Sequence, residues 1–240
     1  MDVEIVLVRH GESERNLSCD HAREGRPEWL ARQMREETEE ELWPLTETGR
    51  DQARRTGAWI RENVGSAFDV GVCSPYVRAR DTAHLLGFDV NWREDERVRE
   101  RLWGDYCAAG LEPYTVDGYL QHLAECADFT WKTPFPGGER LADLVPRVSE
   151  FLHELLAQAS ARAIVVCHGG TLRAMQMVLE RLPEGEHRRM APVRLSNGCI
   201  MQFQLSFVDG DRSRWAGRWR LAQPNIEGAP VSPWRDLAGL

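Results

Sequence analysis

The sequence predicts an α/β protein of three layers, in which a mostly parallel β-sheet carries helices on both faces. Short apolar segments that do not alternate with polar residues recur at residues 3 to 8, 70 to 73 and 163 to 167, as expected of strands buried on both faces. Segments with helical periodicity follow each of them. Strands that alternate with helices of this length favour a parallel sheet covered on both sides.

In the first half of the chain, each element is predicted from its own pattern. Residues 3 to 8 are predicted to form a buried strand, because their apolar residues do not alternate with polar ones. The helix at 44 to 63 has Thr46 as its N-cap, a residue whose hydroxyl can accept a hydrogen bond from a free backbone N–H group. The strand at 70 to 73 precedes a helix that ends at Gly87, since glycine readily adopts the left-handed conformation of a helix end.

The second half of the chain repeats the alternation. A helix from about 141 to 159 leads to the strand at 163 to 167, and the helix at 171 to 182 follows that strand. Residues 199 to 208 form a late strand, and residues 214 to 221 are predicted to be the last strand, at the edge of the sheet.

Two segments outside this alternation are predicted to be cap insertions of a single domain that spans residues 1 to 240. Residues 17 to 43, which include the acidic run EETEEE, are expected to form a helical insertion after the first strand, and residues 105 to 136 form a second insertion. A charged stretch, WREDERVRERLWGDY, lies before the second insertion and is assigned no strand. Because loops over a rigid sheet carry specificity, the caps are where substrate selection is expected.

Composition excludes several classes of protein. The net charge of −8 argues against a nucleic-acid or acidic-membrane partner, since those surfaces need an excess of basic groups. The apolar runs are too short to cross a bilayer, and the first residues lack the basic flank of a secretory signal, so a cytoplasmic protein is expected. The six cysteines contain no C-x-x-C pair, which indicates neither a disulfide framework nor a zinc site. Lys132 is the only lysine, which excludes a P-loop.

Reactive groups follow three of the predicted strands at the point where each strand ends. The carboxyl ends of parallel strands meet at one edge of a sheet, where open α/β sheets bind ligands. Arginine binds phosphate oxygens through two parallel hydrogen bonds, glycines bare N–H groups at helix N-termini, and histidine is a nucleophile at neutral pH. The sequence therefore predicts a metal-free site for a phosphoryl group. The residues at these strand ends are Arg9, His10, Ser74, Arg78, His168, Gly169 and Gly170.

Around these residues the chain resembles the histidine phosphatase superfamily, the phosphoglycerate-mutase-like proteins. The matching stretches occur in the family's order and span roughly residues 3 to 205. The resemblance implies the phosphoglycerate-mutase-like three-layer fold and activity on a small phosphorylated substrate without a cofactor. The matching stretches are RHGES with Asn16, LTETGRDQA, SPYVRARDTA, RERLWGDY, PGGE and CHGGTLRA.

The resemblance also implies a role for each site residue. His10 is the nucleophile that becomes a phosphohistidine, and Glu100 is the general acid for the leaving oxygen and then the base for water. His168 donates to the phosphoryl oxygens in the transition state. A covalent histidine replaces one difficult displacement with two easier ones, and fixed cationic donors stabilise the charge. The groups expected to bind phosphate are Arg9, His10, Arg78, His168, Gly169 and Asn16. Weaker candidates for the site are Arg80, Glu139 and Arg140.

Hydrolysis is predicted, and other functions remain open. Mutases of this kind resemble one another in a long segment after the catalytic glutamate, with a lysine and an arginine pair that hold the substrate carboxylate. Here only 36 positions separate Glu100 from Pro136, with Lys132 as the one lysine and no Arg-Arg pair between them. A phosphatase of protein phosphohistidine is a further possibility, although those chains resemble a core without the two insertions. A non-catalytic phosphate-binding module is the remaining alternative.

A competing motif lies in the same region. CHGGTLR, from Cys167 to Arg173, satisfies the C-x-x-G-x-x-R pattern of cysteine-dependent phosphatases. A thiolate at a helix N-terminus has a lowered pKa and is nucleophilic. However, Val166 and Ala174, which flank the motif, differ from the histidine and the serine or threonine of that family. The sequence therefore favours Cys167 as the buried last residue of its strand.

Overall fold

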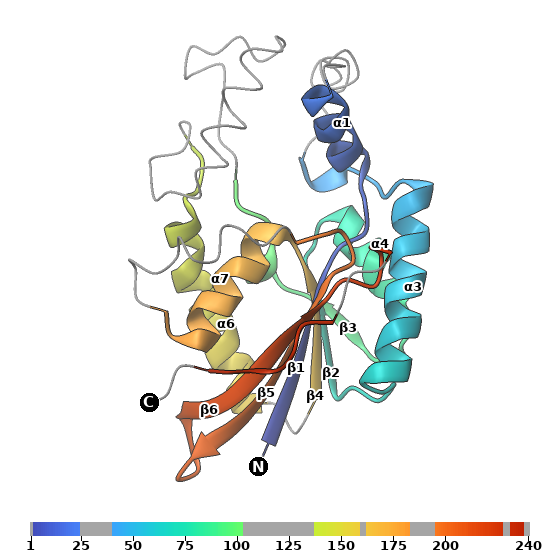
Figure 1. The fold of residues 1–240 in the computed structure, drawn as a ribbon. Helices are drawn as coiled ribbons and strands as arrows, with labels where there is room; N and C mark the ends of the chain where they lie inside the picture. The colour runs from blue at the N-terminus through green and yellow to red at the C-terminus, as the bar shows by residue number, and fades with distance from the viewer. Residues whose placement is uncertain are drawn as a thin grey trace.

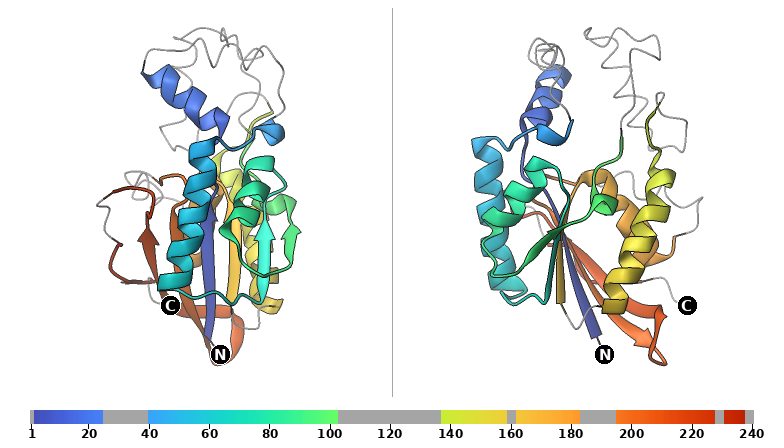
Figure 2. Two further views of the ribbon diagram at one scale, coloured as in Figure 1. Left: turned by 90° about the vertical axis from the view of Figure 1, so that its right-hand side faces the viewer. Right: turned by 180° about the vertical axis from the view of Figure 1, so that it is seen from behind.

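A seven-stranded sheet lies between two layers of helices in the computed structural model, which describes residues 2–24, 40–102, 137–158, 162–182, 195–227 and 231–237 (Figure 1). The strands are β1 (Asp2–Arg9), β2 (Val70–Cys73), β3 (Trp92–Glu94), β4 (Arg162–Cys167), β5 (Ile200–Val208), β6 (Asp211–Ala222) and β7 (Arg235–Asp236). The helices are α1 (Glu14–Arg23), α3 (Glu47–Asn63), α4 (Val77–Leu86), α6 (Leu141–Gln158) and α7 (Gly169–Glu180), with the short 3-10 helices η1 (Glu40–Leu42) and η2 (Glu96–Val98). Helices α3 and α4 cover one face of the sheet, and α6 and α7 cover the other (Figures 1 and 2). The predicted three-layer α/β fold is confirmed.

The sheet has the order β3-β2-β4-β1-β5-β6-β7 and is mostly parallel. Strands β1 to β4 run in one direction. Strand β5 pairs antiparallel with β1, and β6 pairs antiparallel with β5, so β6 runs with β1 again. The carboxyl ends of β2, β4 and β1 therefore lie side by side in the middle of the sheet.

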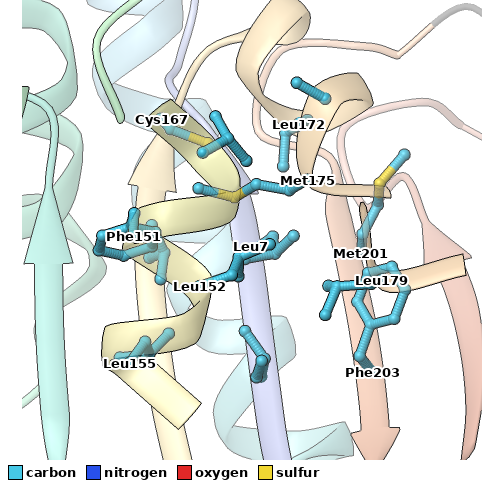
Figure 3. Close-up of a cluster of buried hydrophobic side chains, with 14 of the residues drawn as sticks. Leu7, Phe151, Leu152, Leu155, Cys167, Leu172, Met175, Leu179, Met201 and Phe203 are labelled. Atoms are coloured by element: carbon cyan, nitrogen blue, oxygen red, sulfur yellow. The ribbon is translucent and has the colours of Figure 1, made fainter. Parts of the chain in front are cut away.

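The side chains of β1 alternate between the two faces of the sheet. Val3, Ile5 and Leu7 pack in the cluster that contains the buried faces of α6 and α7, whereas Val6 and Val8 pack with α3 and α4. This alternation is the period of two that any strand imposes. Figure 3 shows Leu7 between side chains of α6 and α7 (Figure 3). Ile5 to Val8 therefore present apolar side chains to both faces of the sheet, as the run of hydrophobic residues predicted.

The predicted helix signals are confirmed. Thr46 is the N-cap of α3 and its hydroxyl accepts a hydrogen bond from the N–H of Gly49. Helix α4 ends at Gly87, which has a left-handed φ of 71°. At the start of α3, a Cβ atom on Gly11 would overlap the carbonyl of Gly49. Glycine at both positions lets the first turn of α3 lie directly against the turn that follows β1.

Some predicted boundaries were wrong. Helix α3 begins at Glu47 and α7 at Gly169, and α1 begins at Glu14, before the expected insertion. The charged stretch after α4 contains β3, which among the described strands pairs with β2 alone. Its side chains are partly exposed, so it lacks the apolar run of a buried strand. Strand β6 is not the edge, because the two-residue β7 pairs with it.

The predicted caps are described only in part. Residues 17 to 23 belong to α1, which lies beyond the carboxyl end of β1 (Figure 1), and residues 40 to 42 form η1. Residues 25 to 39 and the second predicted cap, 105 to 136, lie outside the described residues. In the part of the chain that is described, none of the helices combines the length and apolar character needed to span a membrane.

Candidate active site

The structure brings together the three predicted strand ends. The ring centroids of His10 and His168 lie 5.0 Å apart. Nε2 of His168 is 2.8 Å from the hydroxyl of Ser74, the first residue after β2. All three side chains are buried. The adjacency of β2, β4 and β1 in the sheet is the direct cause of this convergence.

The hydrogen bonding of His10 determines its tautomer. Its Nδ1 lies 2.6 Å from the carbonyl oxygen of Gly11. A carbonyl oxygen can only accept, so Nδ1 carries the proton and Nε2 keeps a lone pair. Burial, followed by the charges of Arg78 and Arg9, lowers the pKa of His10 well below 6.5, and the bond to Gly11 offsets this only in part. His10 is therefore a neutral ring with a free Nε2 at neutral pH.

His168 is a second neutral imidazole. Burial lowers the pKa of His168 well below 6.5, and the charges of Arg78 and Arg9 act in the same direction. The Ser74 hydroxyl already accepts a bond from the N–H of Tyr76 at 3.3 Å, so its own proton can be donated to Nε2 of His168. The ring proton then lies on Nδ1. That nitrogen is buried and has no hydrogen-bond partner among the described residues.

Two arginines supply the positive charge of the site. Arg78, on the first turn of α4, is 3% exposed, and its guanidinium lies 4.7 Å from the centre of the Tyr76 ring. Arg9 donates to the carbonyl of Leu195. A Cβ atom on Gly169 would lie 3.6 Å from Nε of Arg9, so this guanidinium lies beside the first turn of α7. The positive end of the α7 dipole adds to the two charges.

Hydrogen bonds to the side-chain oxygen of Asn16 hold its amide group in place. Its Oδ1 accepts bonds from the N–H of Ser13 at 3.1 Å, the Ser13 hydroxyl at 3.0 Å and Nδ2 of Asn197 at 3.0 Å. Nδ2 of Asn197 also donates to the carbonyl of His10, at 3.1 Å. The orientation of the Asn16 amide is therefore fixed, with its NH₂ group as the remaining donor. Sequence reasoning missed Asn197, whose position before Gly198 signals only a turn.

Glu100 lies against the same helix N-terminus. Its Oε1 accepts a bond from the N–H of Arg101 at 3.0 Å. A Cβ atom on Gly170 would lie 2.5 Å from this oxygen, so only glycine leaves room for the carboxylate beside α7. Gly170 directly follows Gly169 and is two residues from His168. The Glu100 side chain thus lies beside the first turn of α7, which begins one residue after His168.

The other candidates differ in position. Arg80 forms an ion pair with Glu94, and Arg140 forms one with Asp143, and all four side chains are at least a third exposed. Glu139 binds the segment that carries Glu100, through Arg99. Among the described residues, no group of three or more His, Cys, Asp or Glu side chains could hold a metal ion.

Cys167 does not fit the alternative motif. Its thiol is fully buried and lies in the core between α6 and α7 (Figure 3). Burial, followed by the charge of Glu100, raises the pKa of Cys167 far above that of a free thiol. A thiol that stays protonated in an apolar core is a poor nucleophile. The C-x-x-G-x-x-R pattern is therefore a coincidence of a strand end and a helix start.

Comparisons with known proteins find relatives that match most of the chain. The 2,3-bisphosphoglycerate-dependent phosphoglycerate mutase of Azorhizobium caulinodans is 34% identical over 218 residues, which cover 85% of this chain and 93% of the relative. The mutase of the same name from Sinorhizobium fredii is 30% identical over 213 residues, with coverages of 84% and 89%. A mycobacterial glucosyl-3-phosphoglycerate phosphatase, solved with inorganic phosphate, superimposes with a TM-score of 0.62 at 25% identity and covers 94% of this chain and 100% of its own.

The family itself follows from a match over most of the chain. The model of the histidine phosphatase superfamily (branch 1) matches residues 5–215. This range includes every strand end of the site and Glu100. The chain belongs to the histidine phosphatase superfamily.

Proposed function

We propose that the protein is a phosphomonoester hydrolase that acts on a small phosphorylated metabolite through a phosphohistidine on His10. The observation that carries the proposal is the 2.6 Å contact between Nδ1 of His10 and the Gly11 carbonyl, which leaves Nε2 as the nucleophile in a neutral ring. The buried Arg78 and the partly buried Arg9 add two positive charges, and planar guanidinium donors match the oxygens of a phosphoryl group.

In the first step, Nε2 of His10 attacks phosphorus and the bond from phosphorus to the ester oxygen breaks. Glu100, in its protonated form, gives its proton to the leaving alkoxide. Arg9, Arg78 and Nδ1–H of His168 hold the phosphoryl oxygens as charge builds on them. The products of this step are a free alcohol, a phosphohistidine and the Glu100 carboxylate.

In the second step, the Glu100 carboxylate takes a proton from water as the water oxygen attacks phosphorus. The bond from phosphorus to Nε2 breaks, inorganic phosphate leaves and the lone pair returns to Nε2. Asn16 and the N–H of Gly169 are the further phosphate donors. The arginines supply the positive charge that a metal ion would otherwise provide, so activity is expected to persist in EDTA. We also place this reaction in the cytoplasm.

Trapping the intermediate tests the proposal. Wild-type protein quenched during turnover of a radiolabelled phosphomonoester should carry phosphate that is labile in acid and stable in base. His10→Ala should carry no label and have no turnover, whereas the control Cys167→Ser should retain both. Loss of activity in Cys167→Ser with full activity in His10→Ala would reverse the assignment.

A mutase is the second candidate, because the curated relatives described above bear that name. A mutase returns the phosphoryl group to a substrate, whereas a hydrolase passes it to water. Phosphorus NMR of a mixture with 3-phosphoglycerate and 2,3-bisphosphoglycerate separates the two. Growth of the inorganic phosphate signal supports the hydrolase, and growth of 2-phosphoglycerate at constant total ester supports the mutase. Sugar phosphates and glucosyl-3-phosphoglycerate complete the substrate panel.

A further inference from the structure

The segment that carries Glu100 is neither a helix nor a strand, and side chains from elsewhere hold it. Glu139, which precedes α6, forms a two-pronged ion pair with Arg99: Nη1 lies 2.6 Å from Oε2 and Nη2 lies 2.9 Å from Oε1. Oε2 of Glu139 also accepts a bond from the N–H of Leu102 at 2.8 Å, and the N–H of Glu139 donates to the Leu102 carbonyl at 2.8 Å. Glu139 therefore binds Arg99 and Leu102, which lie on either side of Glu100 in the chain.

Arg147, on α6, holds the backbone of the same segment. Its Nη1 donates to the carbonyls of Arg97 at 2.5 Å and Arg99 at 3.1 Å, and its Nη2 lies 3.4 Å from the carbonyl of Glu100. The hydroxyl of Thr171, on α7, donates to the Arg99 carbonyl at 2.7 Å. Backbone carbonyls around Glu100 are thus bound by side chains from both helices on this face of the sheet.

The ion pairs of Glu139 with Arg99 and Arg147 also balance charge in the segment that carries Glu100. Although burial alone would raise it, the pKa of Glu139 is lowered by hydrogen bonds from Arg99 and Leu102 and by the charges of both arginines, so Glu139 is an anion at neutral pH. Burial lowers the pKa of Arg147, and the negative charge of Glu139 offsets this effect, as does the smaller contribution of Glu100. Glu139 thus supplies negative charge to both arginines that hold the segment.

We propose that Glu139 and Arg147 are positioning residues that hold the Glu100 carboxyl group against Gly170, at the position from which it protonates the leaving oxygen. This inference rests on the proposed function, because it requires Glu100 to act as the general acid. The hydrogen bonds of both residues described above run to the Glu100 segment and not to His10, Arg9 or Arg78. Their effect on His10 phosphorylation should therefore be large for a leaving group that needs a proton and small for one that does not.

The test compares single-turnover phosphorylation of His10 by an alkyl phosphate and by nitrophenyl phosphate, since only the alkoxide needs a proton. Glu139→Gln, which keeps size but removes charge, should slow the alkyl reaction by roughly tenfold to a hundredfold, within the span of general acid catalysis. The nitrophenyl reaction should slow by less than about threefold. Arg147→Met, which keeps the apolar stem, should have the same pattern, and Glu139→Asp should restore part of the alkyl rate.

Glu4→Gln is the matched control. Glu4 pairs with Arg162 at 2.8 Å, with side-chain exposures of 17% and 26% that resemble the 16% and 21% of Glu139 and Arg99. It lies at the start of β1, at the opposite end of the sheet from the site. Glu4→Gln should leave the ratio of alkyl to nitrophenyl rates unchanged, even where it lowers the unfolding midpoint as much as Glu139→Gln does.

A double-mutant cycle separates positioning from general damage. In the Glu100→Gln background, Glu139→Gln should cost less than about a further twofold in the alkyl reaction. A Glu139→Gln effect that is equal for both leaving groups, or that multiplies with Glu100→Gln, overturns the positioning role. If Glu100→Gln itself leaves the ratio unchanged, the general acid assignment fails, and the positioning role fails with it. If Glu139→Gln does not fold, Glu139→Asp takes its place. Its ratio of alkyl to nitrophenyl rates must then shift in the direction expected for Glu139→Gln.

Discussion

The strand-end centre and the Glu100 segment are built in different ways. His10, Ser74 and His168 follow three neighbouring strands, so the sheet itself sets their separation. Glu100 has no strand or helix beneath it and depends on an ion pair and carbonyl contacts from α6 and α7. The residues proposed to transfer the phosphoryl group are thus positioned by the sheet. The proposed proton donor is positioned by side-chain contacts from neighbouring helices.

This difference predicts two separable kinds of defect. A change in the strand-end centre should impair every substrate equally, because each substrate transfers the same phosphoryl group. A change around Glu100 should impair substrates in proportion to the basicity of the leaving oxygen. The following variants test this distinction by comparing the losses for alkyl and nitrophenyl phosphates.

The largest effect is expected for Arg78→Lys. Lysine keeps the charge but loses the planar pair of donors that matches two phosphoryl oxygens. Removal of one such donor from a transition state typically costs on the order of a hundredfold to a thousandfold in rate. Single-turnover assays should give the same loss for alkyl and nitrophenyl phosphates. A loss confined to the alkyl substrate would place Arg78 with the proton donor and not with the phosphate.

A smaller and selective effect is expected for Gly170→Ala. The new methyl group would overlap Oε1 of Glu100 and push the flexible carboxylate aside, at little cost to the fold. Alanine is favoured over glycine inside a helix by up to about 1 kcal/mol, so stability should be unchanged or slightly higher. The alkyl reaction should fall by roughly tenfold to a hundredfold, with little change for nitrophenyl phosphate. Equal losses would mean that Gly170 serves the phosphate and not Glu100.

Ser74→Ala should have a more modest effect that is equal for both leaving groups. Without the hydroxyl, nothing selects the His168 tautomer with its proton on Nδ1, so part of the population loses a phosphate donor. We expect roughly a tenfold lower rate of His10 phosphorylation, with Ser74→Thr recovering part of it. The comparison of rates for the two substrates is the measurement. An unchanged rate would show that Ser74 does not select the tautomer.

The smallest effect concerns stability and pH. The pKa of His10 is lowered by burial and by Arg78 and Arg9, so the folded state stays neutral while the unfolded chain takes up a proton below pH 6.5. Stability should therefore be complete above pH 6.5 and fall as the pH drops from there toward the folded pKa. The slope of the free energy of unfolding against pH, measured by urea unfolding below pH 6.5, should be smaller in His10→Gln by about 1.4 kcal/mol per pH unit. Parallel curves for the two proteins would contradict the lowered pKa.

The sequence was sufficient where the structure is local. The apolar runs of β1, β2 and β4, the cap at Thr46 and the end at Gly87 depend on neighbouring residues, and all were predicted correctly. The meeting of His10 with His168 was expected from strand parallelism, and the pairing of β1 with β4 brings it about.

The rest depends on contacts between distant residues. Glu139 binds Arg99 across 40 positions and Asn197 binds Asn16 across 181, and no periodic pattern marks such pairs. Strand β3 was missed because an edge strand of three half-exposed residues has no apolar signature. Glu139 was a weaker candidate in the sequence, and its contacts with the Glu100 segment, like those of Arg147, became visible only in the structure.

The alternation of β1 has one more consequence, for how the sequence can change. Arg9 lies beside the first turn of α7, while its neighbour His10 interacts with Arg78 on α4. Loss or gain of a single residue within β1 would turn Leu7 toward the wrong helices and exchange the directions of the arginine and the nucleophile. Deletion of one residue from this strand should therefore impair folding and activity together, whereas deletion of two residues preserves the alternation of its side chains.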